Sequence, residues 1–273
     1  MSQHPKTSRI TVAEIRALKG KEKIVCLTAY SAPIAALLDP FVDLILVGDT
    51  LGMVVHGLPT TVGVTLDMMI MHGRAVMRGA MRAMVVVDLP FGSYEGDPRQ
   101  AHESAVRIMR ETGCTAVKVE AGGGVPEAID FLVRRGIPVV GHVGLRPQAA
   151  NLDGGYKTKG RSAAEEERVL AEARAVDQAG AFAIVVESVT ADLADRITQE
   201  VGAPTIGIGA SPNCHGQILV LDDMVGLFDR TPKFVRRYGA MRDLITQAVQ
   251  AYSADVRAGT FPGPAEVYAS KAR

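Results

Sequence analysis

Short apolar runs that end in a polar residue recur along the chain. LILVGD, MVVVD, AVKVE, VVGH and AIVVE end, in that order, at these positions: Asp49, Asp88, Glu120, His142 and Glu187. Nearly continuous apolar runs are typical of parallel strands that are covered on both faces. A polar residue that follows such a strand lies at the rim of the sheet, so the five ends predict one site built from many strands.

Helical patterns alternate with these runs. We expect capping signals at the start of four helices: Thr11 with Glu14, Asp97 with Pro98, Ser162 with Glu165, and Thr190. Four helices are predicted to end at a left-handed glycine two residues before the next strand: Gly113, Gly136, Gly180 and Gly202. The predicted strands span residues 24–28, 44–49, 84–88, 116–120, 138–142, 183–187, 204–208 and 217–221.

Eight strands with helices between them predict an α/β fold, a (β/α)8 TIM barrel preceded by a short N-terminal helix. An open doubly wound sheet is the alternative. Polar ends on strands two to six favour the closed ring, because there they converge. We expect one domain over residues 1–273, with residues 1–10 disordered and helices after about residue 238. The connection over 143–161 is predicted to be an active-site lid, since long loops in compact domains are usually functional.

Composition narrows the class of protein. Thirty basic residues balance 30 acidic ones. This balance argues against a nucleic-acid partner. The three cysteines lie far apart and are expected to be ordinary buried or loop residues. No apolar run approaches membrane-spanning length, and the N-terminus lacks a signal-peptide core. We therefore expect a soluble cytoplasmic protein with small-molecule substrates and no membrane partner.

Three carboxylates end strands two, three and four: Asp49, Asp88 and Glu120. Hard oxygen ligands that converge on one point suit Mg²⁺, which keeps positions open for water or substrate. Each could instead cap a helix or pair with an arginine. Three carboxylates at the ends of successive strands favour a metal site over these alternatives.

Lys118 lies two residues before Glu120, so both side chains share one face of the strand. Pointing inward, Lys118 needs an anion, which the metal carboxylates or a substrate carboxylate could supply. The competing reading is a Schiff-base lysine of an aldolase.

Glu187 is predicted to be a general base, since an acid in apolar surroundings has a raised pKa. It could alternatively pair with Arg196 or Lys157. His142 could hydrogen-bond substrate or be structural. A divalent ion beside a lysine and a base indicates enolate chemistry on a 2-oxo acid: the base removes the proton next to the keto group and the metal holds the enolate. The electrophile is not determined by these residues.

Several short motifs, in the same order along the chain, resemble those of a known family. From about residue 28 to 268, the chain closely resembles the 3-methyl-2-oxobutanoate (ketopantoate) hydroxymethyltransferase family in these segments: VGDTLGM, VDLPFGSY, VKVEAGG, PVVGHVGLRPQ, NLDGGYKTKGR, VVES, IGIGAS and FPGPAEVY. The resemblance implies a magnesium-dependent one-carbon transferase of pantothenate and coenzyme A biosynthesis, with one Mg²⁺ per subunit. It would carry a hydroxymethyl group from 5,10-methylenetetrahydrofolate to 3-methyl-2-oxobutanoate, giving 2-dehydropantoate and tetrahydrofolate.

By position, the resemblance implies that Asp49, Asp88 and Glu120 coordinate the metal. Asp49 and Asp88 would also contact the oxo acid, Thr50 and Lys118 would hold it, and Glu187 would accept the proton. A homo-oligomer, a homodecamer of stacked rings, is implied as well. Three positions depart from the family pattern: Thr50 stands for a usual serine, Lys159 for a common glutamine and His215 for a usual aspartate.

Two alternatives remain open at this point. A metal-dependent 2-oxo acid aldolase or lyase on the same barrel would work without folate. A non-catalytic barrel that serves as a binding module would keep clustered carboxylates at a desolvation cost for no purpose.

Overall fold

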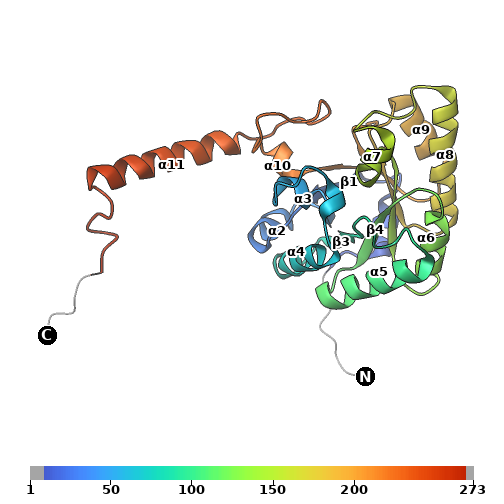
Figure 1. The fold of residues 1–273 in the computed structure, drawn as a ribbon, viewed down its shortest axis with the longest axis horizontal. Coiled ribbons are helices and arrows are strands. Elements are labelled where there is room, and N and C mark those ends of the chain that lie inside the picture. The colour runs from blue at the N-terminus through green and yellow to red at the C-terminus, as the bar shows by residue number, and fades with distance from the viewer. Residues whose placement is uncertain (1–8, 269–273) are drawn as a thin grey trace, which may run out of the picture. The chain divides into compact units, whose positions relative to one another are not determined.

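The computed structural model describes residues 9–268, and within them eight strands close into one parallel barrel. The strands follow chain order around the ring, and β8 pairs with β1. Figure 1 labels β1, β3 and β4 of this barrel. They are β1 (Ile24–Thr28), β2 (Leu44–Val47), β3 (Met84–Asp88), β4 (Ala116–Glu120), β5 (Val139–Gly144), β6 (Ala183–Glu187), β7 (Thr205–Ile208) and β8 (Gly216–Leu219). The predicted (β/α)8 fold is confirmed.

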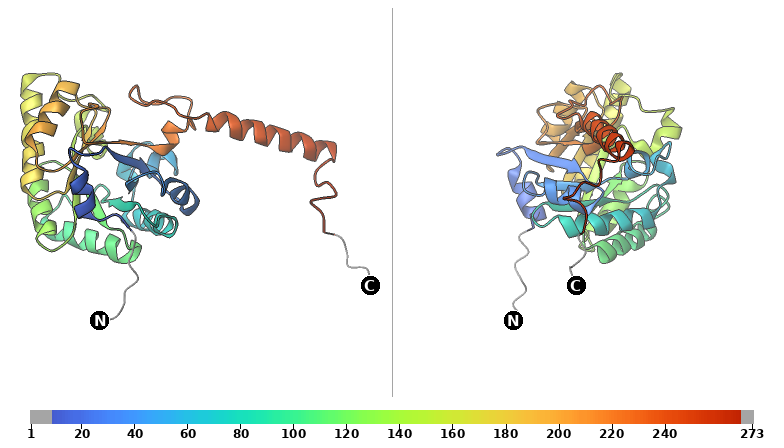
Figure 2. Two further views of the ribbon diagram at one scale, coloured as in Figure 1. Left: turned by 180° about the vertical axis from the view of Figure 1, so that it is seen from behind. Right: turned by 90° about the vertical axis from the view of Figure 1, so that its left-hand side faces the viewer.

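Helices follow the strands and cover the outside of the ring (Figure 2). These are α2 (Ala32–Leu38), α4 (Leu66–Gly79), α5 (Pro98–Thr112), α6 (Val125–Val133), α8 (Ala163–Gln178) and α9 (Ala191–Glu200), whereas α1 (Val12–Leu18) precedes β1. The chain divides into two compact units, residues 1–221 and 222–273, and the barrel lies in the first. The expectation of a single domain over 1–273 stays a prediction.

Alternate side chains along each strand enter two different cores. In β2, Leu44 and Leu46 join a cluster inside the barrel, whereas Ile45 and Val47 join the larger cluster between the strands and the helices. Ile15 of α1 belongs to the inner cluster. Because side chains alternate along a strand, a polar residue two or four positions beyond an inward apolar one also points into the barrel.

The helix caps follow the sequence signals in part. Thr11 and Glu14 form the predicted capping box, and Asp97 accepts the N–H groups of Arg99 and Gln100. Gly113, Gly136 and Gly180 take the left-handed conformation, with φ of 78°, 82° and 95°. This conformation closes each helix without the steric cost that a β-carbon would add.

Two cap predictions are wrong and a third holds only in part. α9 ends in an extended Val201, and the N–H of Gly202 donates to Asp177 Oδ2 at 2.8 Å instead of making a left-handed turn. Thr190 occupies the N-cap position but accepts no cap hydrogen bond, and its hydroxyl donates to Gly160 O at 3.4 Å. Only half of the box at Ser162 forms.

The Glu165 carboxylate accounts for the missing half of that box. Its Oε2 accepts the N–H groups of Gly160 and Arg161 in place of the Ser162 N–H. Strand ends differ slightly as well: β5 runs on to Gly144, and β8 ends at Leu219. The expected disorder over residues 1–10 falls largely outside the described residues. At its end, Arg9 and Ile10 hydrogen-bond to backbone oxygens of residues 80, 82 and 83, which corrects the prediction there.

Two long connections leave the carboxyl ends of β2 and β5. The first holds α3 (Leu51–Val54) and a 3₁₀ turn, η1 (Thr61–Gly63); the second holds η2 (Pro147–Ala149) and α7 (Ala150–Asp153). Near the end of the second, the buried Lys159 Nζ lies 2.9 Å from Asp153 Oδ2, and Lys159 pairs with Val189 beyond β6. This connection is therefore tied down at its end. Its role as a lid stays a prediction.

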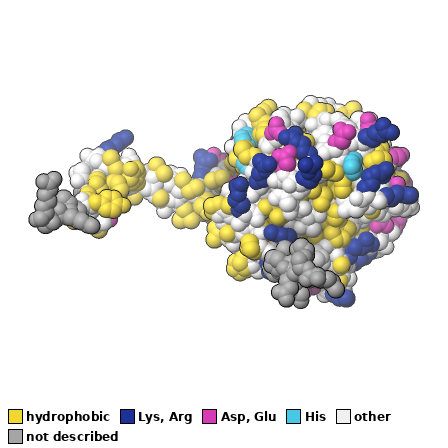
Figure 3. All heavy atoms as spheres, turned by 90° about the horizontal axis from the view of Figure 1, so that it is seen from below, with side chains coloured by type: hydrophobic (Ala, Val, Ile, Leu, Met, Phe, Trp, Pro, Cys, Tyr) yellow, Lys and Arg dark blue, Asp and Glu magenta, His cyan; other side chains and the backbone are white. Residues whose placement is uncertain are grey.

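The second unit contains α11 (Met241–Ala258), and α10 (Leu221–Met224) lies at its start. α11 has no buried residue, and its apolar side chains are visible in the space-filling view (Figure 3). Over the first unit, basic and acidic side chains are interspersed on the face shown there. Within residues 9–268, no helix combines the length and the apolar character needed to cross a bilayer.

Candidate active site

The register of the barrel brings the predicted polar residues together. Asp88 of β3 pairs with Lys118 of β4, and Glu120 pairs with His142 of β5. Lys118 and Glu120 share the face of Ala116, which belongs to the cluster inside the barrel. Neighbouring inward side chains at one rim thus come from successive strands. The sequence prediction that these strand ends converge is confirmed for this set.

Lys118 and Asp88 form a buried ion pair. Lys118 Nζ lies 3.1 Å from Asp88 Oδ1, and both side chains are almost completely buried. The backbone N–H of Asp49 donates to Asp88 Oδ2 at 3.1 Å. Burial opposes the charge on Lys118, but Asp88, Glu120 and Asp49 together raise its pKa above the ordinary lysine value. A lysine held protonated in this way is unsuited to Schiff-base formation, which needs the neutral amine.

The three strand-end carboxylates are buried, and burial raises the pKa of each. Burial, reinforced by the charge of Asp88, raises the pKa of Asp49 to about 7. Burial also raises the pKa of Asp88 and, with the charge of Asp49, raises that of Glu120 well above its ordinary value. No arginine pairs with any of the three among the described residues. The alternative of arginine-paired carboxylates is therefore not observed there, whereas Glu120 does accept the N–H of Gln148 in the first turn of η2.

This donor set fits a hard divalent cation. Three carboxylates share the buried rim with one lysine, so the anionic charge exceeds the cationic charge there. Oxygen donors of this kind are those that Mg²⁺ prefers. Within residues 9–268, however, no three His, Cys, Asp or Glu side chains are already grouped around one point as metal ligands. Several of these oxygens accept hydrogen bonds from the protein instead, and Gln148 is the main donor.

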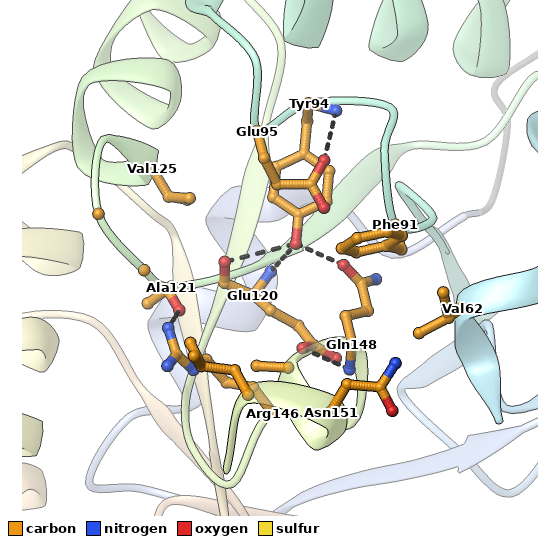
Figure 4. Close-up of a pocket in the computed structure, with 14 residues that line it drawn as sticks. Val62, Phe91, Tyr94, Glu95, Glu120, Ala121, Val125, Arg146, Gln148 and Asn151 are labelled. Atoms are coloured by element: carbon orange, nitrogen blue, oxygen red, sulfur yellow. Dashed lines mark hydrogen bonds between the residues drawn. The ribbon is translucent and has the colours of Figure 1, made fainter. Parts of the chain in front are cut away.

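Gln148 and Tyr94 connect these carboxylates, and neither was assigned a role from the sequence (Figure 4). Gln148 Nε2 donates to Asp49 Oδ2 at 2.8 Å, and its backbone N–H donates to Glu120 Oε2 at 3.1 Å. The buried Tyr94 hydroxyl donates to Gln148 Oε1 at 2.7 Å and accepts the Glu120 N–H at 3.2 Å. Both residues lie within the motifs that carried the family resemblance, and that position was the only available signal.

Glu187 ends β6 at the opposite side of the cluster. Its Oε2 lies 3.3 Å from His142 Nε2, and its side chain is 18% exposed, compared with 3% for His142. Burial and the charge of Lys118 lower the pKa of His142, so its imidazole is neutral near pH 7. The next residue, Ser188, has φ of 46°, a strained value for a residue other than glycine. Because Glu187 contacts His142 and is partly exposed, it can reach both the buried cluster and a substrate.

The remaining predicted positions are distributed around this cluster. Thr50 is half-buried at the start of α3 and makes no side-chain cap. Arg196, an alternative partner of Glu187, pairs with Glu166 and Glu167 instead. His215 lies at the other end of the barrel strands, where its Nδ1 accepts the Thr205 N–H at 3.1 Å. All three cysteines are free and buried, as expected.

A pocket of about 300 Å³ opens beside Glu120 and Gln148 (Figure 4). Its walls come from η1 after β2, the connection after β3, the connection after β4 and the segment from η2 to α7. Three residues of the carboxylate network line this pocket, Tyr94, Glu120 and Gln148, which places it next to the predicted chemistry.

Comparison with known sequences supports a single family. The family model described as ketopantoate hydroxymethyltransferase matches residues 9–264. The chain is 64% identical to the 3-methyl-2-oxobutanoate hydroxymethyltransferase of Phenylobacterium zucineum over 100% of both chains. It is 60% identical to the protein of the same name from Caulobacter vibrioides over 99% of both.

Comparison with solved structures concerns the fold. The phosphoenolpyruvate phosphomutase of Streptomyces platensis matches with a TM-score of 0.62 at 14% identity, covering 95% of this chain and 92% of that one. A 2,3-dimethylmalate lyase, described as a member of the PEP mutase/isocitrate lyase superfamily, matches with a TM-score of 0.58 at 16% identity, covering 94% and 91%. The barrel thus shares its fold with these two enzymes.

Proposed function

The chain belongs to the ketopantoate hydroxymethyltransferase family, and we propose that it performs this reaction at the carboxyl ends of β2 to β6. The enzyme transfers a hydroxymethyl group to 3-methyl-2-oxobutanoate in pantothenate biosynthesis. The donor is 5,10-methylenetetrahydrofolate, and the products are 2-dehydropantoate and tetrahydrofolate. The buried network of Asp49, Glu120 and Gln148 supports this location most directly.

The proposed metal ligands are Asp49, Asp88 and Glu120, with one Mg²⁺ per subunit. Their burial and raised pKa values support the assignment, because a divalent cation offsets the repulsion between them. When bound, the ion would supply Lewis-acid stabilisation of negative charge on the substrate. Lys118 is the cation that the described residues themselves contribute to the cluster.

The oxo acid is proposed to bind between the residues at the ends of β2 and β3 and the Glu187 side chain at the end of β6. Asp49, Asp88 and Thr50 would contact it from the ends of β2 and β3, and Lys118 would offset its carboxylate charge. His142 would offer a neutral imidazole, consistent with its lowered pKa. These groups orient the substrate so that its C3 hydrogen faces Glu187.

Glu187 is the proposed proton acceptor. Its Oε2 lies 3.3 Å from Nε2 of the buried His142. Its own side chain is partly exposed, so a substrate can reach it. A general base must lie within hydrogen-bond reach of the proton that it removes, and an open carboxylate at the rim meets this need. Deprotonation at C3 makes this carbon the nucleophile that receives the one-carbon unit.

Proton exchange tests this assignment without folate. Purified protein with Mg²⁺ and 3-methyl-2-oxobutanoate in D₂O should exchange the C3 hydrogen, followed by NMR. Glu187→Gln should lower the exchange rate by at least about 100-fold, the lower end of general-base contributions. Its Kd for the oxo acid should stay within a few-fold of wild type. Parallel loss of binding and exchange would mark Glu187 as structural.

We further propose that the enzyme is a cytoplasmic homo-oligomer, and specifically a homodecamer as the resemblance implies. Apolar residues on α11 support an oligomer: Met241, Ile245, Val249, Tyr252 and Val256 recur at helical spacing and are all exposed in one chain. Free, buried cysteines agree with a reducing compartment.

A further inference from the structure

The pocket beside Glu120 is lined by groups that no step of the proposed proton transfer uses. At about 300 Å³ it lies at the lower end of the range for small-molecule sites. Because Glu120 and Gln148 form part of its wall, a ligand bound there would lie next to the oxo acid. The occupant must therefore be something that reacts with the oxo acid or is held against it.

The walls of the pocket suit a flat ring. Phe91 lines it with about half of its side chain exposed, and Val62 and Val125 contribute aliphatic surface. In Figure 4, Phe91 and Val62 lie on one side and Val125 on another. Aromatic side chains bind flat heteroaromatic rings by stacking or edge contacts. Such walls favour a planar ligand over a flexible polar one.

Hydrogen-bond donors are available at the edge of the pocket. The Arg146 guanidinium lines it, and one of its nitrogens donates to the Ala121 carbonyl oxygen. Its buried Nε has no hydrogen-bond partner among the described residues. Asn151 adds a side-chain amide that can both donate and accept. These groups match the amide-like edge of a pterin.

Charge distinguishes the ring of a folate from its tail. Glu95 and Glu120 both line the pocket, whereas Arg146 is the single cation among its lining residues. Glu95, which is not one of the proposed metal ligands, would repel the anionic glutamate tail but tolerate the neutral tetrahydropterin. Glu95 also accepts the N–H groups of Gly92 and Tyr94, which hold it in place.

We propose that this pocket binds the tetrahydropterin ring of the folate cosubstrate, with Phe91 against the face of the ring and Arg146 and Asn151 at its edge. The inference rests on the proposed function and extends it to the second substrate. It places the one-carbon unit beside the oxo acid at the Glu120 end of the cluster, and it leaves the glutamate tail outside the pocket.

Two substitutions at the pocket wall test the proposal. Gly123→Leu adds volume there, since a β-carbon at Gly123 meets no atom within 4 Å. Phe91→Ala removes the aromatic face. The probes are tetrahydrofolate and 6-methyltetrahydropterin, which lacks the tail, measured by anaerobic titration calorimetry. Both variants should raise the Kd for both probes roughly tenfold, about 1.4 kcal/mol. The Kd for 3-methyl-2-oxobutanoate should change by much less.

The matched control is Phe41→Ala, a second exposed phenylalanine, which lies before β2 and outside the pocket. It should bind both probes as wild type does. Unaltered Kd values for both probes in Gly123→Leu and Phe91→Ala would overturn the proposal. So would a wild-type enzyme that binds tetrahydrofolate but not the tail-less pterin, because the tail would then be the group held. Absence of C3 exchange in wild type would instead refute the proposed function.

Discussion

At the scale of single residues, the site depends on a side-chain amide as well as on its carboxylates. Gln148 donates to Asp49 and, through its backbone, to Glu120, and Tyr94 fixes the orientation of its amide. Partners that orient metal-binding carboxylates typically contribute 10- to 100-fold to affinity. Gln148 is thus a positioning residue for the proposed metal ligands.

Removing that amide should weaken metal binding. Gln148→Ala is expected to raise the Kd for Mn²⁺, used as a paramagnetic substitute for Mg²⁺, by roughly 10-fold or more. Tyr94→Phe should have a smaller effect in the same direction. Electron paramagnetic resonance of free Mn²⁺ measures both without turnover. The control is the exposed Gln178→Ala. Equal Mn²⁺ affinity in Gln148→Ala and wild type would contradict the positioning role.

The carboxylates also predict how stability depends on pH. The pKa of Asp49 is raised to about 7 in the folded protein, so the folded state binds more protons than the unfolded state between that value and the ordinary one. Stability of the metal-free protein should therefore fall as pH rises toward 7. With EDTA, we expect a higher Tm near pH 5.5 than near pH 7.5, and added Mg²⁺ should restore Tm at the higher pH.

Asp49→Asn provides the comparison for this experiment. Without the titrating group, its Tm should vary less steeply over the same interval, and Mg²⁺ should stabilise it less. Calorimetry at several pH values measures both slopes. A metal-free wild-type Tm that increases from about pH 5.5 to 7.5 would be incompatible with the raised pKa of Asp49.

At the scale of elements, the close contact between β5 and β6 positions the proposed base. Gly144 pairs with Glu187, and its φ of 98° is a conformation that other residues rarely adopt. A β-carbon at Gly144 would lie 2.3 Å from the Glu187 carbonyl oxygen. The glycine therefore allows the end of β6 to approach β5.

Gly144→Ala should displace Glu187 and lower C3 proton exchange by roughly 10-fold or more, because small displacements of a reacting group are costly. It should also reduce stability by about 1–3 kcal/mol, the usual cost of overpacking. Gly79→Ala is the matched control: its β-carbon would lie 2.1 Å from the Ala32 carbonyl oxygen, far from the site in the α2–α4 contact. Equal exchange per folded molecule in the two variants would refute the positioning role of Gly144.

At the scale of the whole molecule, the barrel and the second unit differ in how they bury apolar surface. The barrel encloses two apolar clusters, whereas α11 has no buried residue in one chain. An exposed apolar stripe is typical of a protein–protein contact. The proposed oligomer would give this stripe a partner.

Sedimentation velocity tests that proposal. Wild type should sediment as a multiple of the 29.0 kDa chain, and the decamer at ten times that mass. Ile245→Glu with Val249→Glu should reduce the assembly, because two charges would enter an apolar contact. The control pair, Gln247→Glu with Gln250→Glu, adds the same charge to the same helix outside the stripe. A wild-type monomer at micromolar concentration would contradict the proposal.

The sequence by itself determined the barrel and most of its polar strand ends. Apolar runs of strand length and glycines after helices are local signals, and they placed β3, β4 and β6 at their observed boundaries. Alternation along β4 likewise placed Lys118 on the face of Glu120. Local patterns suffice here because they reflect burial and backbone conformation close to each residue.

Only the tertiary structure decided which groups meet across the chain. Gln148 reaches Asp49 across 99 positions, and Tyr94 reaches Gln148 across 54. The same long-range packing decided that Glu165 turns to Gly160 and that Glu187 lies beside His142 rather than Arg196. Such contacts depend on register and loop path, which a periodic pattern does not encode. The pocket beside Glu120 arises in the same way, from four connections that are distant in sequence.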